Sequence, residues 1–200
     1  MGSPWGVWCN FPGRFASYSL SILPTQLYLD TIGNPPGAVR FYAILYSCWP
    51  TIGLVTTRLL DRTSNRHFSA FCAVTALTTP LYAFGFPTEI WICCALFWPT
   101  LCSCACASRS SLWLGTFIVL LPLFTFTHEA AILFFPLFVI TAMLNSEGIQ
   151  RALLLIAIAS VLTCWLLVKM FVPASPRRRN PVSPVPSVNT LSALLWARRR

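Results

Sequence analysis

Uncharged, mostly apolar runs separated by short charged stretches dominate the pattern along this chain. Each run is close to the roughly 20 residues that a helix needs to cross the hydrocarbon of a bilayer. Arg40 and Arg58 bound the first run, and Glu89 separates the second from the third. The pattern therefore predicts six membrane-spanning segments. They are residues 41–57, 68–88, 90–108, 110–127, 130–146 and 152–168, the last extended to 172 by a snorkelling Lys169.

Helices rather than strands are expected, because strands of a membrane barrel alternate apolar and polar residues over about 10 positions, whereas these runs are apolar throughout. In hydrocarbon a continuous apolar segment must also satisfy its own backbone groups. A weaker run, Phe15–Leu29, contains several serines, Pro24 and Gln26, and leaves three alternatives open: a seventh span, a re-entrant segment or an interfacial helix. The expected fold is an all-α polytopic transmembrane helix bundle.

Three regions follow from this pattern. Residues 1–40 carry the weak segment, residues 41–172 form the bundle, and residues 173–200 are a tail rich in proline and arginine. Low hydrophobicity and repeated prolines predict that this tail is disordered.

Composition supports a membrane protein, because 56% of the residues are hydrophobic and only 10% are charged. Soluble domains carry about 25% charged residues, so a water-soluble surface is excluded for this chain. The net charge of +9 is mostly a property of the tail, which holds arginines and no acid. No stretch interleaves basic and aromatic residues as a nucleic-acid surface does, so a nucleic-acid partner is not expected.

Charged loops predict how the chain is oriented in the membrane. Lys and Arg collect in cytoplasmic loops, and the loop 58–67 carries three arginines against Asp61, so we expect it inside. Alternation then places Glu89, His128 and Glu129 outside, with the arginine-rich tail outside as well, against the same rule. The alternative is that residues 110–146 form a re-entrant pair.

The five acidic residues divide by side. Asp61 and Glu147 lie near arginines in sequence, so we expect ordinary surface charges, with Glu147 paired to Arg151 one helical turn later. The outer acids, Glu89 and Glu129, have no nearby base in sequence except His128, and Asp30 is a candidate to join them. Unpaired ionisable groups at membrane boundaries are costly and often functional.

Glu89, His128 and Glu129 are the candidate catalytic residues. A histidine exchanges protons near neutral pH, and a carboxylate beside it acts as a general base or binds a divalent cation. The competing explanation is capping, because a carboxylate stabilises a helix N-terminus and Thr88 is a capping residue type. The cofactor is left open, with a divalent cation as the candidate. Cys102 and Cys106 share a helix face but cannot close a tetrahedral metal site from one helix, so a hydrophobic role is expected.

Three stretches carry a family resemblance: Phe86–Trp91, Ala95–Pro99 and Phe126–Ala130. In these stretches, and over roughly residues 40 to 172, the chain resembles uncharacterised polytopic inner-membrane proteins of proteobacteria. Those are loosely similar to polytopic membrane glycosyltransferases and exopolysaccharide-assembly proteins, in which acidic residues of outer loops act near a lipid-linked sugar. The resemblance thus implies catalytic roles for Glu89 and Glu129. The chain departs from such enzymes in having fewer helices and no large outer loop, which predicts a fragment or an inactive relative.

Three functions remain as hypotheses. The first is the handling of lipid-linked sugars in cell-envelope glycan assembly, which requires the outer acids to converge. The second is a small transporter or proton-coupled carrier, which requires a polar path to the inner side. The third is a non-enzymatic membrane scaffold subunit, for which helix faces of small residues would dominate.

Overall fold

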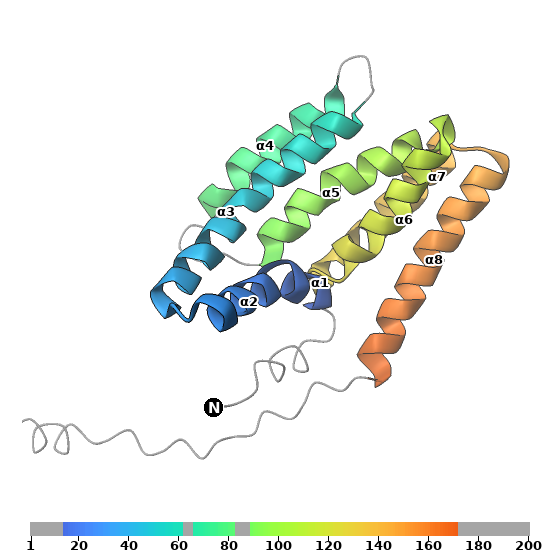
Figure 1. Ribbon diagram of the computed structural model, residues 1–200. Helices are drawn as coiled ribbons and strands as arrows, with labels where there is room; N and C mark the ends of the chain where they lie inside the picture. Colours follow the sequence, from blue (N-terminus) through green and yellow to red (C-terminus); the bar gives the residue numbers. More distant parts are fainter. Residues whose placement is uncertain (1–13, 62–65, 83–88, 172–200) are drawn as a thin grey trace, which may run out of the picture.

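The computed structural model describes residues 14–61, 66–82 and 89–171, and all regular structure in these ranges is helical (Figure 1). The all-α prediction is therefore confirmed for this part of the chain, whereas the predicted tail lies outside the described residues. The elements are α1 (Phe15–Ser17), the π-helical η4 (Tyr18–Ile22), α2 (Leu23–Ile32), α3 (Pro35–Leu60), α4 (His67–Tyr82), α5 (Glu89–Cys106), the 3₁₀ helix η5 (Ala107–Arg109), α6 (Ser111–Thr125), the 3₁₀ helix η6 (Glu129–Phe134), α7 (Phe135–Asn145) and α8 (Gly148–Phe171).

Each of the six predicted runs corresponds to a helix or to consecutive helices. Three helical stretches among the described residues are long and apolar enough to cross a bilayer, namely Pro35–Leu60, Glu89–Arg109 and Gly148–Phe171. The other apolar helices are shorter, as α6 is with 15 residues. Length and composition alone thus identify three candidate spans.

The helices from α3 to α8 run up and down alongside one another and define two ends of a bundle (Figure 1). We call one the Glu129 end, where α5 and η6 begin and α8 finishes. The other is the Arg109 end, where η5 lies and where α7 connects to α8. Glu89 and Glu129 therefore lie at one end and Arg109 at the other, as the predicted alternation of the loops requires.

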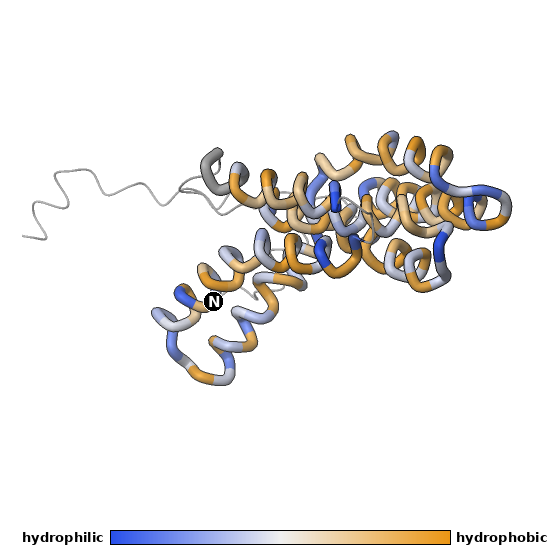
Figure 2. Tube along the Cα trace, turned by 90° about the horizontal axis from the view of Figure 1, so that it is seen from above, coloured by the Kyte–Doolittle hydropathy of each residue, from blue (hydrophilic) through white to orange (hydrophobic). Residues whose placement is uncertain are grey.

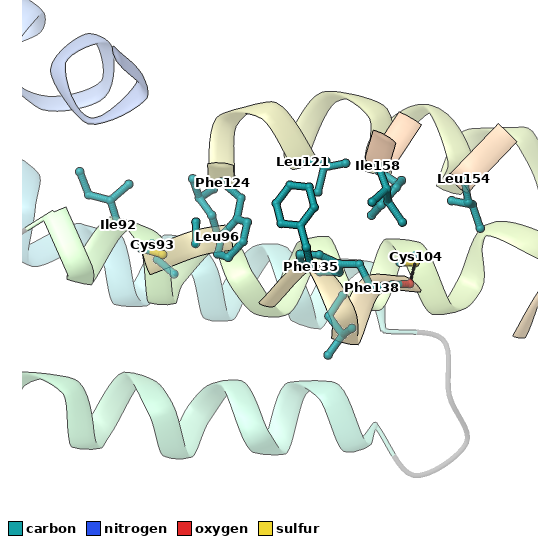
Figure 3. Close-up of a cluster of buried hydrophobic side chains, with 14 of the residues drawn as sticks. Ile92, Cys93, Leu96, Cys104, Leu121, Phe124, Phe135, Phe138, Leu154 and Ile158 are labelled. Atoms are coloured by element: carbon teal, nitrogen blue, oxygen red, sulfur yellow. Dashed lines mark hydrogen bonds between the residues drawn. The ribbon is translucent and has the colours of Figure 1, made fainter. Parts of the chain in front are cut away.

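Helix α5 is the centre of the packing. In its most apolar stretch 67% of the residues are buried, compared with 11% in α8. Figure 3 shows Leu96 of α5 beside Phe124 of α6, and Cys104 of α5 beside Phe138 of α7, where its thiol donates to the Phe138 carbonyl at 3.6 Å. The cysteines at 102, 104 and 106 are buried, in keeping with the hydrophobic role expected of them.

The outward faces of the helices are apolar. Leu77, Val119, Leu144 and Ile156 are among the large hydrophobic side chains that the structure exposes. Figure 2 shows hydrophilic positions gathered mainly at turns and helix ends, with mostly hydrophobic colour along the helices. Monomeric soluble proteins rarely expose apolar patches of this extent, whereas such a surface suits lipid.

The weak run at residues 15–29 is one continuous helix made of α1, the π-helical η4 and α2. It lies across the Glu129 end rather than alongside the other helices (Figure 1). Gly33, in the left-handed conformation at φ 68°, ends α2, and Asn34 then caps α3 by accepting from Gly37 N–H. Glycine fits this turn because side chains with a Cβ are strained at positive φ.

The run 130–146 is not one continuous α-helix, as the sequence pattern suggested. It begins as the 3₁₀ helix η6, and α7 starts only at Phe135, with proline in its first turn. Pro136 has no N–H to donate to a preceding carbonyl, a loss that is tolerated in the first turn of an α-helix but not in its interior, so the α-helix begins beside Pro136 rather than continuing through it.

Two expectations for the Arg109 end are wrong. Asp61 is not an ordinary surface charge, because it is 3% exposed and its Oδ2 accepts from the N–H and hydroxyl of Ser69 at 2.9 and 3.0 Å. Its carboxylate thus fixes the start of α4, where backbone N–H groups lack helical partners. Arg151 donates from Nε to the Ser146 carbonyl at 2.7 Å, and no ion pair to Glu147 occurs within the described ranges.

The close crossing of α3 and α5 makes a testable prediction. A Cβ at Gly53 would overlap the Ala95 carbonyl oxygen and lie 2.7 Å from the Ala95 Cα, whereas a Cβ at Gly115 meets nothing within 4 Å. Gly53→Leu should therefore lower the free energy of unfolding by about 1–3 kcal/mol or more, since backbone cannot give way as a side chain does. Gly115→Leu is the matched control. The stability of both variants is measured by thermal unfolding in detergent, with a thiol-reactive dye that reports when the buried cysteines become exposed. Equal stability of the two variants would contradict the close packing of α3 against α5.

Candidate functional site at the Glu129 end

Glu129 lies between two cations. Its Oε1 accepts from Lys169 Nζ at 2.8 Å, and its Oε2 accepts from Arg14 Nη2 at 3.1 Å and Nε at 3.3 Å. The three side chains come from the start of η6, the end of α8 and the residue before α1. Segments far apart in sequence therefore meet on one carboxylate.

Arg14 also reaches the second predicted acid. Its Nη1 lies 3.4 Å from Glu89 Oε1, at the start of α5. The guanidinium therefore bridges Glu89 and Glu129, and the four residues Arg14, Glu89, Glu129 and Lys169 form what we call the ion cluster. Side-chain exposure in the cluster is between 27% and 34%, so the charges are shielded in part but remain reachable from the end of the bundle.

Hydrogen bonds from the N-terminal helix place Arg14. Ala16 N–H donates to the Phe126 carbonyl at 2.9 Å, and the Ser17 hydroxyl donates to the Thr127 carbonyl at 2.7 Å. Phe126 and Thr127 follow the end of α6, so their carbonyls have no helical partner ahead of them. The first turn of the N-terminal helix satisfies them and sets Arg14 over Glu129.

Lys169 is held by its own helix and by Glu129. Its ammonium lies 5.4 Å from the ring centroid of Trp165, one turn earlier on α8. A cation over an indole face is attracted by the ring's quadrupole. The sequence-based role of Lys169, a snorkelling charge at a helix end, thus becomes a specific ion pair.

The proposal that the outer acids are unpaired is wrong. Glu89 and Glu129 do come together, but each has a cationic partner that sequence proximity did not reveal. The predicted sidedness of the loops, rather than proximity in sequence, could have indicated these cationic partners. Alternation places Lys169 on the side of these acids, and it places Arg14 there as well if residues 15–29 do not cross the bilayer.

His128 and Asp30 take no part in the contacts of the cluster. His128 Nδ1 accepts from Ala130 N–H at 3.1 Å, which makes it the cap of η6. Asp30 accepts from Gln26 at 2.8 Å on the same exposed helix, roughly 20 Å along α2 and η4 from Arg14 by helical rise. Thr88, the expected cap of Glu89, lies outside the described residues.

The two cations control the protonation of Glu129. Partial burial raises the pKa of this carboxyl group, but the hydrogen bonds from Lys169 and Arg14, together with their positive charges, outweigh burial and lower it from 4.5 to about 2. Glu129 is therefore ionised at neutral pH. A carboxylate held this strongly is a poor general base while both cations contact it.

The described residues do not form a metal site. Across residues 14–61, 66–82 and 89–171, no three His, Cys, Asp or Glu side chains gather as ligands for an ion. The chemistry that the cluster does offer is recognition of an anion by Arg14 and Lys169, and of hydroxyl groups by the two carboxylates.

No family model, curated protein or solved structure matches this chain.

The ion cluster predicts a pH-dependent loss of stability. Because its pKa is lowered in the folded state, Glu129 contributes stability above pH 4.5, and this contribution fades as the pH falls towards 2. Glu129→Gln should cost about 1 kcal/mol or less at pH 7, since these partly exposed charges are screened. The difference from the wild type should vanish near pH 2. Unfolding in detergent at a series of pH values measures this, with Asp30→Asn as control, and a pH-independent difference would contradict the ion pairing.

Proposed function

We propose that this chain is a six-span protein of the cell inner membrane that binds an anionic, lipid-linked sugar at the Glu129 end of the bundle. In this proposal Arg14 and Lys169 hold the phosphate of the lipid carrier, and Glu89 and Glu129 face the sugar. The observation that carries it is the ion cluster, which draws opposite charges from four separate segments to one end of the bundle.

Six crossings are supported by the contacts of Arg14. Because this one side chain touches both Glu89 and Glu129, the start of α5 and the start of η6 lie at the same depth. Helix α5 with η5 is long enough to cross a bilayer, and α6 returns from η5 to that depth. Lys169 brings the end of α8 to the same level. Short helices such as α6 would then cross where the bilayer thins to match them.

The position of the ion cluster at the ends of the proposed spanning helices supports a lipid headgroup as the ligand. Charged side chains at the ends of spanning helices lie where headgroups do. Arg presents a planar fork that matches phosphate oxygens, and Lys adds a point charge. Tyr42 of α3 lies close enough to Glu89 to feel its charge, and its ring centroid is 4.7 Å from that of the buried Tyr46, so aromatic hydroxyl groups continue from the cluster towards the core. This mixture of cations, carboxylates and hydroxyls suits a sugar phosphate.

A scaffold subunit is the second candidate, because small residues line two outward grooves. One on α3 includes Ala43, Ser47 and Thr51, and one on α6 includes Ser111 and Gly115. Small residues allow close approach of a neighbouring membrane helix. The low pKa of Glu129 also favours a structural role for the cluster over proton transfer.

The carrier hypothesis gains less support. A pocket between α3, α4 and α5, lined by Pro50, Cys72 and Trp91 among others, has a volume of about 10 Å³. That is room for about one water molecule. A cavity of this size does not provide a polar path between the two ends.

Binding of a defined lipid tests the proposal. In nanodiscs the wild type should bind a polyprenyl phosphate in preference to the uncharged polyprenol. The double variant Arg14→Gln, Lys169→Met should lose about tenfold or more in affinity, because charge-assisted hydrogen bonds contribute about 1.5–3 kcal/mol each. Arg40→Gln removes an exposed arginine from α3 and is the matched control. Native mass spectrometry or equilibrium binding measures the affinities.

Equal binding of polyprenol and polyprenyl phosphate would contradict the proposal, as would unchanged affinity in the double variant. Either result, together with stable folding of the variants, would favour the scaffold subunit.

A further inference from the structure

The N-terminal arm, residues 14–32, is bonded to the bundle at its first end, packs Leu20 of η4 against the core, and joins α3 at its other end. At its first end, Arg14 bridges Glu89 and Glu129, while Ala16 and Ser17 bond to the carbonyls after α6. At its other end Gly33, with φ 68° and no atom within 4 Å of where a Cβ would be, leads into α3. Figure 1 shows the arm lying across the Glu129 end between these two points.

The two halves of the arm are held differently. The first half, α1 and η4, buries Ala16, Ser17, Tyr18 and Ser21, whereas α2 has no buried residue. A stacked pair of rings, Tyr28 on Phe41, joins α2 to α3 near the glycine turn. The π-helical η4 lies where the buried half meets α2, and such turns are uncommon in helices and frequent at functional sites.

Arg14 covers the acids that a ligand would need. It contacts the Oε1 of Glu89 and the Oε2 of Glu129, and Lys169 contacts the Oε1 of Glu129. Arg14 occupies one oxygen of each carboxylate, so its departure frees both oxygens for the hydroxyl groups of a sugar. A phosphate group is a competing partner for the same guanidinium, since Arg binds phosphate and carboxylate with the same fork.

We propose that the N-terminal arm is a gate, which an anionic phosphate group opens by drawing Arg14 away from Glu89 and Glu129. The first half of the arm then leaves the carbonyls of Phe126 and Thr127, and the arm turns about Gly33. This inference rests on the proposed function, because the phosphate of the lipid carrier is the group that opens the gate.

Opening the gate changes what Glu129 can do. The contacts of Arg14 are among the causes that keep the pKa of Glu129 low, so their loss raises this pKa towards its usual value. The carboxylate becomes a better proton acceptor only when the anionic group is in place. Binding of the ligand and readiness of the carboxylate are thereby coupled.

Hydrogen exchange of the arm's backbone tests the gate, because the Ala16 N–H is bonded to Phe126 only while the arm is closed. The full chain in nanodiscs should show at least about tenfold faster exchange over residues 16–22 when polyprenyl phosphate is bound. Polyprenol should leave the exchange unchanged. Inorganic pyrophosphate distinguishes the two sources of phosphate: faster exchange with it as well would mean that the phosphate alone opens the gate.

Variants test the gate without ligand. The double variant Glu89→Gln, Glu129→Gln removes both partners of Arg14 in the cluster and should speed exchange over residues 16–22. Asp30→Asn, on the same arm, is the matched control and should not. Slow exchange around Leu101 in α5 shows in each case that the bundle remains folded.

Two results overturn the inference in different ways. If polyprenyl phosphate binds and exchange over residues 16–22 stays slow, the gate is wrong and the proposed function stands. If polyprenyl phosphate does not bind, the proposed function fails and the gate fails with it.

Discussion

Pairing of scarce charges on an apolar helix bundle is the constraint on which this structure depends. The helices expose large apolar side chains along their lengths, and the chain has only five acidic residues in total. A charge placed in hydrocarbon without a partner is costly, so charges move to helix ends and pair there. The ion cluster is the result at one end of the bundle. It links the N-terminal helix, α5, η6 and α8, whose other contacts are mostly apolar.

The helices could be predicted from sequence because charged residues bound the uncharged runs. Arg58, Glu89 and Arg109 each lie within a few residues of an observed helix boundary. The convergence of Glu89 and Glu129 could also be anticipated, since alternation places both on one side. The break at Phe135 could not be read from hydropathy, because Pro136 acts through backbone geometry and hardly changes the apolar pattern.

Pairing partners were the part that sequence could not supply. Arg14 is 115 residues from Glu129, and Lys169 is 40 residues away, so only the packing of the helices brings them together. Asp61 shows the same limit, because its burial follows from Ser69 folding back over it at the start of α4. His128 was a candidate for chemistry, yet its ring caps η6. Local sequence identifies which residues carry charge, and tertiary structure decides which of them meet.

Spin labels placed on the outward face of the bundle test most directly whether lipid surrounds these helices. Nitroxides at Val119 of α6 and Ile156 of α8, in the protein reconstituted in liposomes, should be reached by oxygen and shielded from a water-soluble nickel complex. A label at Asn145, at the Arg109 end, should show the opposite. If Val119 and Ile156 were as open to the nickel complex as Asn145, water would surround the bundle and the account would be contradicted.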